Sequence, residues 1–359
     1  MSAHRILGLS AGSKGSARAL LGRLAAIRAT RWSGLALLLL LGAALFADCL
    51  ASDLPILLRL RGELYVLPNM TRPGALRPFD NQTLAGQLGP GDFAIWPLVR
   101  YGPSQTQPGG RLDVNQPPSS AHWLGTDDVG RDVFAGVVHG ARVAFLVGLF
   151  SVLLSVLIGL LLGALAGSML GLMDGMVTWG VAVMTSFPAF VLVLVVQGLV
   201  RAQDLWGIVL LLGLTGWAGV ARLVRGEVLR ARSLVHVEAA RALGASRARV
   251  LLVHVIPYAR GPVLVAATFG MASAILVESG LSFLGLGPDT ASWGRILAIG
   301  LTNREAWWLV LFPGMAISAT VLAYNFFAEG LQEALDPRRE VLPRSRRKGA
   351  AHAAPGRAR

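Results

Sequence analysis

Cysteine, lysine and charged residues in general are scarce in this chain of 359 residues. Cys49 is the only cysteine, so one chain can build neither a disulfide framework nor a thiolate metal cluster, and redox chemistry is not expected. Only Lys14 and Lys348 are lysines, and neither stands in a Gly-Lys-Ser or Gly-Lys-Thr sequence. The chain therefore lacks the usual phosphate-binding loop and is not expected to hydrolyse ATP by itself.

Apolar residues are abundant instead. Hydrophobic residues make up 54% of the chain and charged residues only 15%, a balance typical of a membrane protein with several spans. The net charge of +13 comes mainly from arginines that cluster beside apolar runs. This pattern favours a membrane surface over nucleic acid as the partner. We therefore expect contact with membrane lipid and no binding of nucleic acid.

Six apolar windows have about the length of a transmembrane helix, which needs roughly 20 residues. We expect an all-α membrane protein with six transmembrane helices near residues 32–50, 143–169, 176–200, 205–224, 262–284 and 307–327. The basic stretch before the first window is long, and no convincing cleavage site follows that window. We therefore interpret the first window as an uncleaved anchor rather than a secretory signal.

Two thirds of the 33 lysines and arginines lie in three segments. Six precede Ser33, eight lie from Arg222 to Arg260, and eight follow Leu331. Anionic lipid and the membrane potential retain positive loops inside the cell. Both termini and the loop 225–260 are therefore predicted to be cytoplasmic, in a multi-pass protein of the bacterial inner membrane.

The chain is predicted to divide into five parts. They are a basic cytoplasmic N-terminal arm (1–31), a first span (32–50), a periplasmic insert (51–140), a core of five further spans with the cytoplasmic loop (141–338), and a basic tail (339–359). The insert is rich in Pro, Gly, Asn and Gln and contains a strand-like stretch at 63–67. The tail has too little apolar surface to offset the entropy of ordering, so we expect it to be disordered.

The cytoplasmic loop has the local signals of two short helices. Residues 235–243 favour a helix, and Gly244 can end it in the left-handed conformation at no steric cost. Ser246 can cap a second helix at 247–255, which Pro257 is expected to end. The loop is therefore predicted to be a pair of helices with a sharp bend between them.

The first of these helices carries Glu238, Ala239 and Ala240. The two alanines leave little side-chain bulk, so a partner surface can approach the helix closely. Glu238 lies near the helix N-terminus, where its charge suits the dipole and offers a contact. These features predict docking of the helix into a groove of another protein.

Five positions of this loop resemble the cytoplasmic motif of the inner-membrane permeases of ABC importers: Glu238, Ala239, Ala240, Gly244 and Pro257. That motif reads Glu-Ala-Ala, three residues, Gly, nine residues, Ile, one residue, Leu-Pro. The chain departs from it at two positions, with His254 in place of Ile and Ile256 in place of Leu. The peptide-permease branch of the family often has a histidine at this position, so the departure narrows the resemblance to that branch.

Segments outside the loop extend the resemblance. Residues 122–133 and 278–287 look like signatures of the dipeptide and oligopeptide permeases (DppC/OppC type), and the likeness covers roughly residues 122–338. In the insert, residues 55–59 and 94–102 look like the YejE-type permease of peptide and microcin uptake.

The resemblance implies a fold, a function and partners. The chain would be a non-catalytic permease subunit of an ATP-driven importer for peptides or peptide-like compounds, with the ABC importer permease fold. Its partners would be a second, homologous permease, a cytoplasmic ABC ATPase and a periplasmic solute-binding protein. ATP would be bound by the ATPase, so no cofactor is expected in this chain. Dipeptides, longer peptides, microcins, glutathione and nickel chelates all remain open as cargo.

Glu278 is a carboxylate in an apolar span, where such a group usually faces a cavity or a partner. With Ser282 it is a candidate for the translocation path or the subunit interface. A neighbouring serine could instead satisfy it, or it could lie near the outer surface. A proton- or ion-coupled secondary transporter that uses Glu278 is the alternative function. An intramembrane hydrolase based on Ser282 is disfavoured because no histidine lies in a predicted span.

Acidic residues and a histidine also cluster before the second span: His122, Asp127, Asp128 and Asp132. The glycines among them indicate tight turns in which aspartates bond to backbone amides, and we favour this structural interpretation over a metal site. Arg131 is expected to pair with one of the acids. Asp174 is expected to be a solvated residue of a short inner turn.

Overall fold

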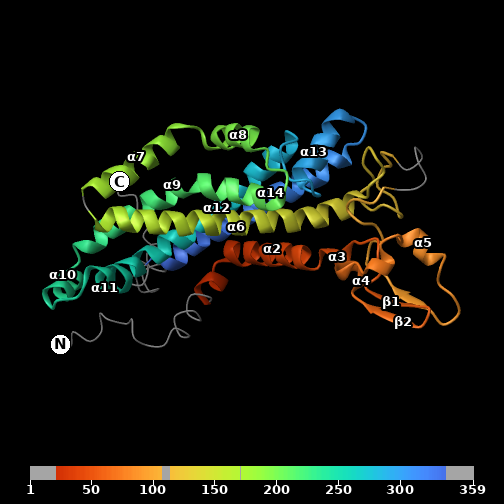
Figure 1. The fold of residues 1–359 in the computed structure, drawn as a ribbon, viewed down its shortest axis with the longest axis horizontal. Coiled ribbons are helices and arrows are strands. Elements are labelled where there is room, and N and C mark those ends of the chain that lie inside the picture. Colours follow the sequence, from red (N-terminus) through yellow and green to blue (C-terminus); the bar gives the residue numbers. More distant parts are fainter. Residues whose placement is uncertain (1–21, 107–113, 170, 337–359) are drawn as a thin grey trace, which may run out of the picture.

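The computed structural model describes residues 22–106, 114–169 and 171–336. The predicted disordered tail, 339–359, lies outside these residues, as does most of the N-terminal arm. The described chain is mostly helical. Five helices are long and apolar enough to cross a membrane: α2 (Arg28–Leu45), α6 (Val133–Ser168), α9 (Leu205–Arg232), the helical run that ends with α12 (Arg247–Phe283), and α14 (Trp308–Leu335). They lie roughly along one direction (Figure 1).

The third predicted window falls on a broken helix. It is divided into α7 (Leu172–Ser186) and α8 (Ala189–Val200), which meet at an angle of 90°. Phe187 between them has an extended backbone, with φ −98° and ψ 141°. The cause is Pro188, because a residue before proline avoids the helical region. The described chain therefore has up to six spans, the sixth only if the bent pair crosses as one.

Helix α6 begins ten residues before the apolar window that predicts it. Asp132 caps it, since its carboxylate accepts a hydrogen bond from the backbone N–H of Ala135 at 2.9 Å. Residues 133–140, expected in the insert, are therefore the first turns of α6. Hydropathy does not join these residues to the span, because His139 and Arg142 interrupt the apolar run.

Helices α6 and α9 pack with their backbones close together. Gly159, Gly163 and Gly167 stand one turn apart on α6, and a Cβ added to any of them would meet α9 within 2.7 Å. On α9 the facing side chains include Val224 and Val228, both fully buried. This spacing of small residues is a common way for membrane helices to approach.

The insert between α3 (Ala47–Leu50) and α6 contains a small antiparallel sheet in the order β2-β1-β3. Its strands are β1 (Leu57–Leu60), β2 (Glu63–Val66) and β3 (Phe93–Ile95). The strand-like stretch predicted at 63–67 is thus confirmed for its first four residues. Two short helices, α4 (Pro68–Thr71) and α5 (Asn81–Ala85), and the 3₁₀ turn η2 (Gly74–Leu76) complete it.

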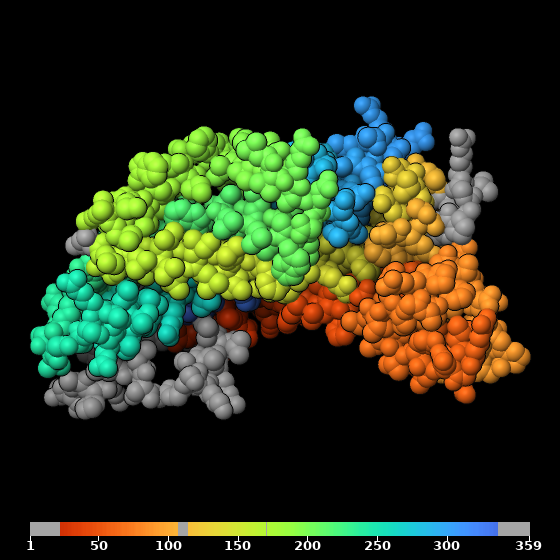
Figure 2. Space-filling view, viewed as in Figure 1, coloured from red at the N-terminus to blue at the C-terminus, as the bar shows by residue number. Residues whose placement is uncertain are grey.

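The insert is fastened to the helices beside it. His139 of α6 bonds through Nε2 to the carbonyl oxygen of Ala51 at 2.9 Å. Arg142 of α6 forms an ion pair with Asp48 of α3 at 2.7 Å. Figure 2 shows the insert as a lobe that stands out at one end of the molecule.

Helix α13 (Trp293–Thr302) was not predicted, because it is too short for a membrane window. It packs near the same end of the molecule as the insert (Figure 1). Trp293 is almost fully buried and donates its indole N–H to the carbonyl oxygen of Val137 in α6 at 2.8 Å. Trp308 at the start of α14 similarly donates to Thr126 at 3.0 Å. The two indoles hold α13 against the start of α6 and α14 against the loop before it.

Candidate coupling loop and membrane cavity

The predicted first helix of the loop is α10 (Val235–Ala242), at the end of the molecule opposite the insert (Figure 1). Val237 is its buried residue and packs in one apolar cluster with Val228 of α9. Glu238 and Ala239 are exposed and Ala240 is half-buried. One buried side chain thus anchors α10, and the residues of the motif face outward.

Apolar side chains flank this exposed surface. Val235 is 82% exposed and Leu243 is 88% exposed. Because both side chains are exposed in the chain, they bury little apolar surface against it.

Gly244 has a φ of +82°, the left-handed conformation that the sequence predicts. Its N–H donates to the carbonyl oxygen of Arg241 at 2.9 Å, and the N–H of Ala245 donates to that of Ala240 at 3.1 Å. These bonds satisfy carbonyls that the end of α10 would leave open. The expected end of the first helix is confirmed.

Ser246 caps the second helix as predicted, because its hydroxyl accepts a hydrogen bond from the N–H of Arg249 at 3.4 Å. The expected end of that helix at Pro257 is wrong. From α11 (Arg247–Arg249) the chain passes through a π-helical segment (Val250–Val255) directly into α12 (Ile256–Phe283). Pro257 lies in the first turn of α12, where its missing N–H and fixed φ are tolerated.

This continuity joins the loop to a span. One helical run of 37 residues extends from Arg247 to Phe283. His254 lies in the π-helical segment, and His254, Ile256 and Pro257 are each half-buried. The residues of the motif that follow Gly244 are thus built into the base of a long helix.

His236 and Tyr258 fasten α10 to this helix. The Tyr258 hydroxyl and His236 Nε2 lie 3.2 Å apart, and the two rings stack with centroids 5.5 Å apart. The contact bridges 22 positions of the sequence, so local pattern offered no signal of it. The loop is therefore a folded unit rather than a flexible connection.

Glu278 and Ser282 are both buried within the chain. The Ser282 hydroxyl donates to Glu278 Oε1 at 2.7 Å, and the Ser279 hydroxyl lies 3.4 Å from Oε2. The alternative that neighbouring serines satisfy this carboxylate therefore has direct geometric support. A role of this pair in the path or the subunit interface stays a prediction.

The cluster before α6 has a structural role. His122 Nδ1 lies 2.8 Å from Asp132 Oδ2, and Asp132 also caps α6. Asp127 accepts backbone N–H bonds from Val129 and Arg131, and its ion pair with Arg131 measures 2.7 Å. The predicted backbone bonding and the pairing of Arg131 are confirmed. The fourth member, Asp128, is exposed.

Asp174 is not the solvated turn residue that was expected. It lies in the first turn of α7, and its carboxylate accepts from Arg225 Nε at 2.5 Å and from Nη2 at 2.9 Å. Arg225 belongs to α9, 51 positions later. A two-pronged pair of this kind fixes orientation as well as distance.

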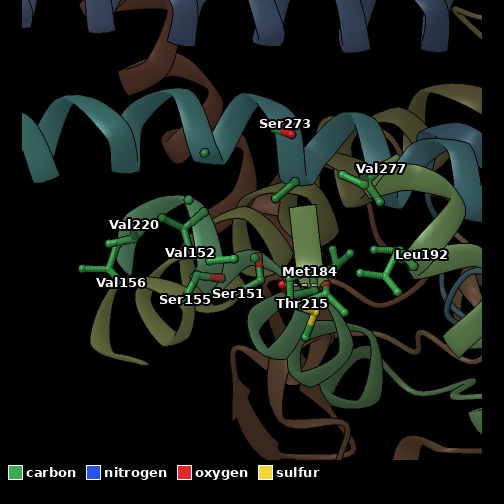
Figure 3. A pocket seen from close by; sticks show the side chains of 18 of the residues that line it. Ser151, Val152, Ser155, Val156, Met184, Leu192, Thr215, Val220, Ser273 and Val277 are labelled. Carbon is green, nitrogen blue, oxygen red and sulfur yellow. Dashed lines mark hydrogen bonds between the residues drawn. The ribbon is translucent and has the colours of Figure 1, made fainter. Parts of the chain in front are cut away.

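A cavity of about 390 Å³ lies between α6, the bent pair α7–α8, α9 and α12. Its lining is apolar apart from hydroxyl side chains. Ser151, Ser155, Thr185, Thr215 and Ser273 contribute hydroxyls from α6, α7, α9 and α12. Figure 3 shows four of them, Ser151, Ser155, Thr215 and Ser273, among valines, Leu192 and Met184. Hydropathy could not reveal this cavity, because its lining residues are spread over four apolar segments.

The sequence of this chain is similar to that of known transport proteins. Residues 159–341 match the family described as binding-protein-dependent transport system inner membrane component. The chain is 39% identical over 230 residues to the dipeptide transport system permease protein DppC of Bacillus subtilis (strain 168), which covers 63% of this chain and 72% of the relative. The oligopeptide transport system permease protein OppC of the same organism is 36% identical over 230 residues, with 63% and 75% covered.

A putative peptide permease protein of Brucella suis biovar 1 (strain 1330) is 36% identical over 235 residues, which cover 64% of this chain and 78% of the relative. Among solved structures, the crystal structure of an amino acid ABC transporter with histidines shares 18% identity. That match covers 56% of this chain and 95% of the other, with a TM-score of 0.46.

The chain belongs to the family of binding-protein-dependent transport system inner membrane components. It is a permease subunit of an ABC importer and a multi-pass protein of the bacterial inner membrane. The resemblance drawn from the loop and the two further motifs is confirmed at this level. The alternative function, an ion-coupled secondary transporter, belongs to a different class from the binding-protein-dependent systems that the chain matches.

Proposed function

We propose that this permease carries peptides or peptide-like compounds and that a separate ATPase drives it through α10. The observation that carries the proposal is the construction of the loop. Helix α10 exposes Glu238 and Ala239, and the residues after Gly244 run without interruption into α12. The names of the related permeases support a peptide substrate.

The proposal includes three partners. A cytoplasmic ABC ATPase docks on α10, a second and homologous permease completes the path, and a solute-binding protein delivers the cargo from outside. ATP binds to the ATPase, so this chain holds no cofactor of its own. The exposed apolar side chains Val235 and Leu243 beside the motif favour a protein partner at this surface.

The topology that we propose has six spans, with α7–α8 counted as one. Both chain ends and α10 lie in the cytoplasm, and the insert lies in the periplasm. Arginine placement supports this orientation, because eight of the basic residues lie from Arg222 to Arg260. The narrower assignment to the peptide and microcin branch rests on residues 55–59 and 94–102 and stays a prediction.

Closure of the ATPases on ATP would move α10 as a rigid body. The buried Val237 and the His236–Tyr258 contact transmit that movement to α9 and α12. The helical run from Arg247 then carries it along the span. ATP binding at the ATPase and cargo binding in the spans each shift the populations of the inward-open and outward-open states, and transport follows from these shifts.

Replacement of Gly244 tests this coupling. Gly244→Trp places a side chain at a φ of +82°, which L-residues rarely adopt, on the docking surface itself. Gly226→Trp is the matched control, because Gly226 lies on α9 with open space beside it and no positive φ. We expect uptake of a labelled peptide and binding of the ATPase to fall at least ten-fold in Gly244→Trp alone. Undiminished uptake by a correctly inserted Gly244→Trp protein would refute the coupling role.

A further inference from the structure

The cavity beneath α7–α8 has the size of a ligand site. Its volume of about 390 Å³ lies within the range of roughly 300 to 1,000 Å³ that is usual for small-molecule pockets. Four helical segments form its wall, and the hydroxyls of Ser151, Ser155 and Thr215 lie close together on one side of it (Figure 3). The cavity is therefore a defined compartment within the spans.

The wall of this cavity is uncharged. Among the described residues that line it, every side chain is apolar or carries a hydroxyl, and none is ionisable. This neutrality is local. The groove of about 1,050 Å³ between α9, α12 and α14 includes Arg230, Glu329 and Glu333. Charged side chains are thus present elsewhere on α9 and on α14 but are missing from this wall.

Glu278 shows how the neutrality is preserved. It directly follows Val277, which lines the cavity, yet its own side chain is 1% exposed. Its two oxygens are engaged by the hydroxyls of Ser282 and Ser279 within the chain. A carboxylate one position away from the lining is thereby kept out of the cavity.

Four of the five hydroxyls in the wall donate their protons to backbone carbonyl oxygens, namely those of Ser151, Ser155, Thr185 and Thr215. Ser155 donates its proton to the carbonyl oxygen of Gly213 at 3.0 Å, and Ser151 donates to Val147 at 2.5 Å. Thr215 donates to the carbonyl oxygen of Leu211 at 2.9 Å. Because the protons of these four hydroxyls are directed at backbone carbonyls, their oxygen lone pairs are what remains for a ligand. N–H groups are the complementary ligand atoms.

We propose that this cavity is a transit site for the backbone of a short peptide, which binds through its N–H groups whatever the charge of its side chains. The inference rests on the proposed peptide function and adds the site and its selectivity. A path must bind its cargo well enough to admit it and weakly enough to release it. A fixed charge in a medium of low dielectric would retain peptides of opposite charge and exclude those of like charge. A neutral wall avoids both effects.

Charged variants of Ser273 test the proposal. Ser273 lines the cavity from α12 and is exposed in the chain, so a larger side chain has room there. Ser273→Asp and Ser273→Lys are compared with the neutral Ser273→Asn in the complete transporter, reconstituted in liposomes with its ATPase and saturating binding protein. Initial uptake rates are measured for Ala-Lys-Ala, Ala-Glu-Ala and Ala-Ala-Ala.

We expect Ser273→Asp to raise or lower the ratio of Ala-Lys-Ala to Ala-Glu-Ala uptake at least five-fold, and Ser273→Lys to change it in the opposite direction. Wild type and Ser273→Asn should share one ratio. A ratio that stays within two-fold of wild type in both charged variants overturns the transit site. Failure of wild type to take up any of the three peptides would instead overturn the proposed peptide function.

A second pair of variants decides the matter if both charged proteins are inactive towards all three peptides. Thr215→Val removes the acceptor oxygen at nearly constant shape, whereas Thr215→Ser keeps it. We expect uptake of Ala-Ala-Ala to fall several-fold in Thr215→Val and to persist in Thr215→Ser. Equal uptake by Thr215→Val and wild type would overturn the proposal.

Discussion

Asp174 and Arg225 join the beginning of α7 to α9 through two parallel hydrogen bonds, at 2.5 Å and 2.9 Å. In α7 the buried residues, Val177 and Val181, lie further along the helix, and in α8 the buried Gln197 donates to the carbonyl oxygens of Ala202 and Leu286. The ion pair therefore sets where the bent pair begins relative to the rest of the bundle. Because α7–α8 lines the cavity, the Asp174–Arg225 ion pair also helps to set the shape of the cavity.

Loss of the ion pair should loosen α7. The Arg225 and Asp174 side chains are 33% and 18% exposed, so solvent screens the interaction and its worth is about 1 kcal/mol or less. Asp174→Asn, Arg225→Gln and the double variant form a double-mutant cycle, read by thermal unfolding of the purified protein in detergent. Additive losses in the double variant would show that the pair contributes no coupling energy.

Tyr258→Phe should weaken the attachment of α10. It removes the hydroxyl that contacts His236 at 3.2 Å and keeps the stacked ring. A neutral hydrogen bond is worth about 0.5–1.5 kcal/mol, so we expect faster hydrogen exchange in α10 and weaker stimulation of the ATPase by cargo. Tyr65→Phe is the control, because its hydroxyl bonds to Glu63 in the insert. Equal exchange rates in α10 of the two variants would contradict the prediction.

Gly163→Ala should separate α6 from α9. The added Cβ would lie 2.5 Å from the carbonyl oxygen of Ala221, so the backbones must shift. Overpacking of this kind costs about 1–3 kcal/mol, and we expect a lower unfolding temperature in detergent and a lower yield of inserted protein. Gly198→Ala on α8 is the control, because open space surrounds that glycine. A Gly163→Ala protein as stable as the control would show that the helices are not in close contact.

The insert should lose local stability in acid through Asp80. The Thr83 hydroxyl, and then backbone N–H groups, hold the pKa of Asp80 below its usual value while it caps α5. A carboxylate whose pKa is lower in the folded state stabilises the fold at pH values above its unfolded pKa of about 3.9. This stabilisation is lost as the pH falls through the folded-state pKa. We expect hydrogen exchange in α5 to accelerate below about pH 4.

Thr83→Val provides the comparison for this pH effect. It removes the main cause of the lowered pKa of Asp80, so the acceleration in α5 should begin at a higher pH. Exchange in the distant helix α10 serves as the internal reference and should be the same in both proteins. An unchanged pH profile in α5 of Thr83→Val would contradict the assigned role of Thr83.

Much of the coupling loop could be predicted because its signals are local. Gly244 ends α10 through its own backbone freedom, and Ser246 caps the next helix through its own hydroxyl. The predicted helix end at Pro257 was wrong because proline disrupts a helix at an interior position but is tolerated in the first turn. The π-helical segment before it, which places Pro257 in such a turn, has no clear sequence signature.

Ionisable residues were harder to place, because their partners are distant in the sequence. Asp174 was expected in solvent, yet Arg225 pairs with it across 51 positions. The sequence allowed the Glu278 carboxylate to face a cavity, a partner protein or a neighbouring serine. In the structure its two oxygens lie against the hydroxyls of Ser282 and Ser279. The partner of an ionisable side chain depends on its rotamer and on how the helices pack, and local composition determines neither.

The sequence by itself determined that the chain is a membrane permease, where its apolar helices lie, and where its exposed loop turns. Hydropathy, charge placement and capping act over a few residues and survive in any fold that the chain could adopt. Only the tertiary structure decided that α7–α8 is bent, that an uncharged cavity lies beneath it, and that His236 holds Tyr258. These features arise where helices meet, because the distances between side chains of different helices depend on packing and not on order along the chain.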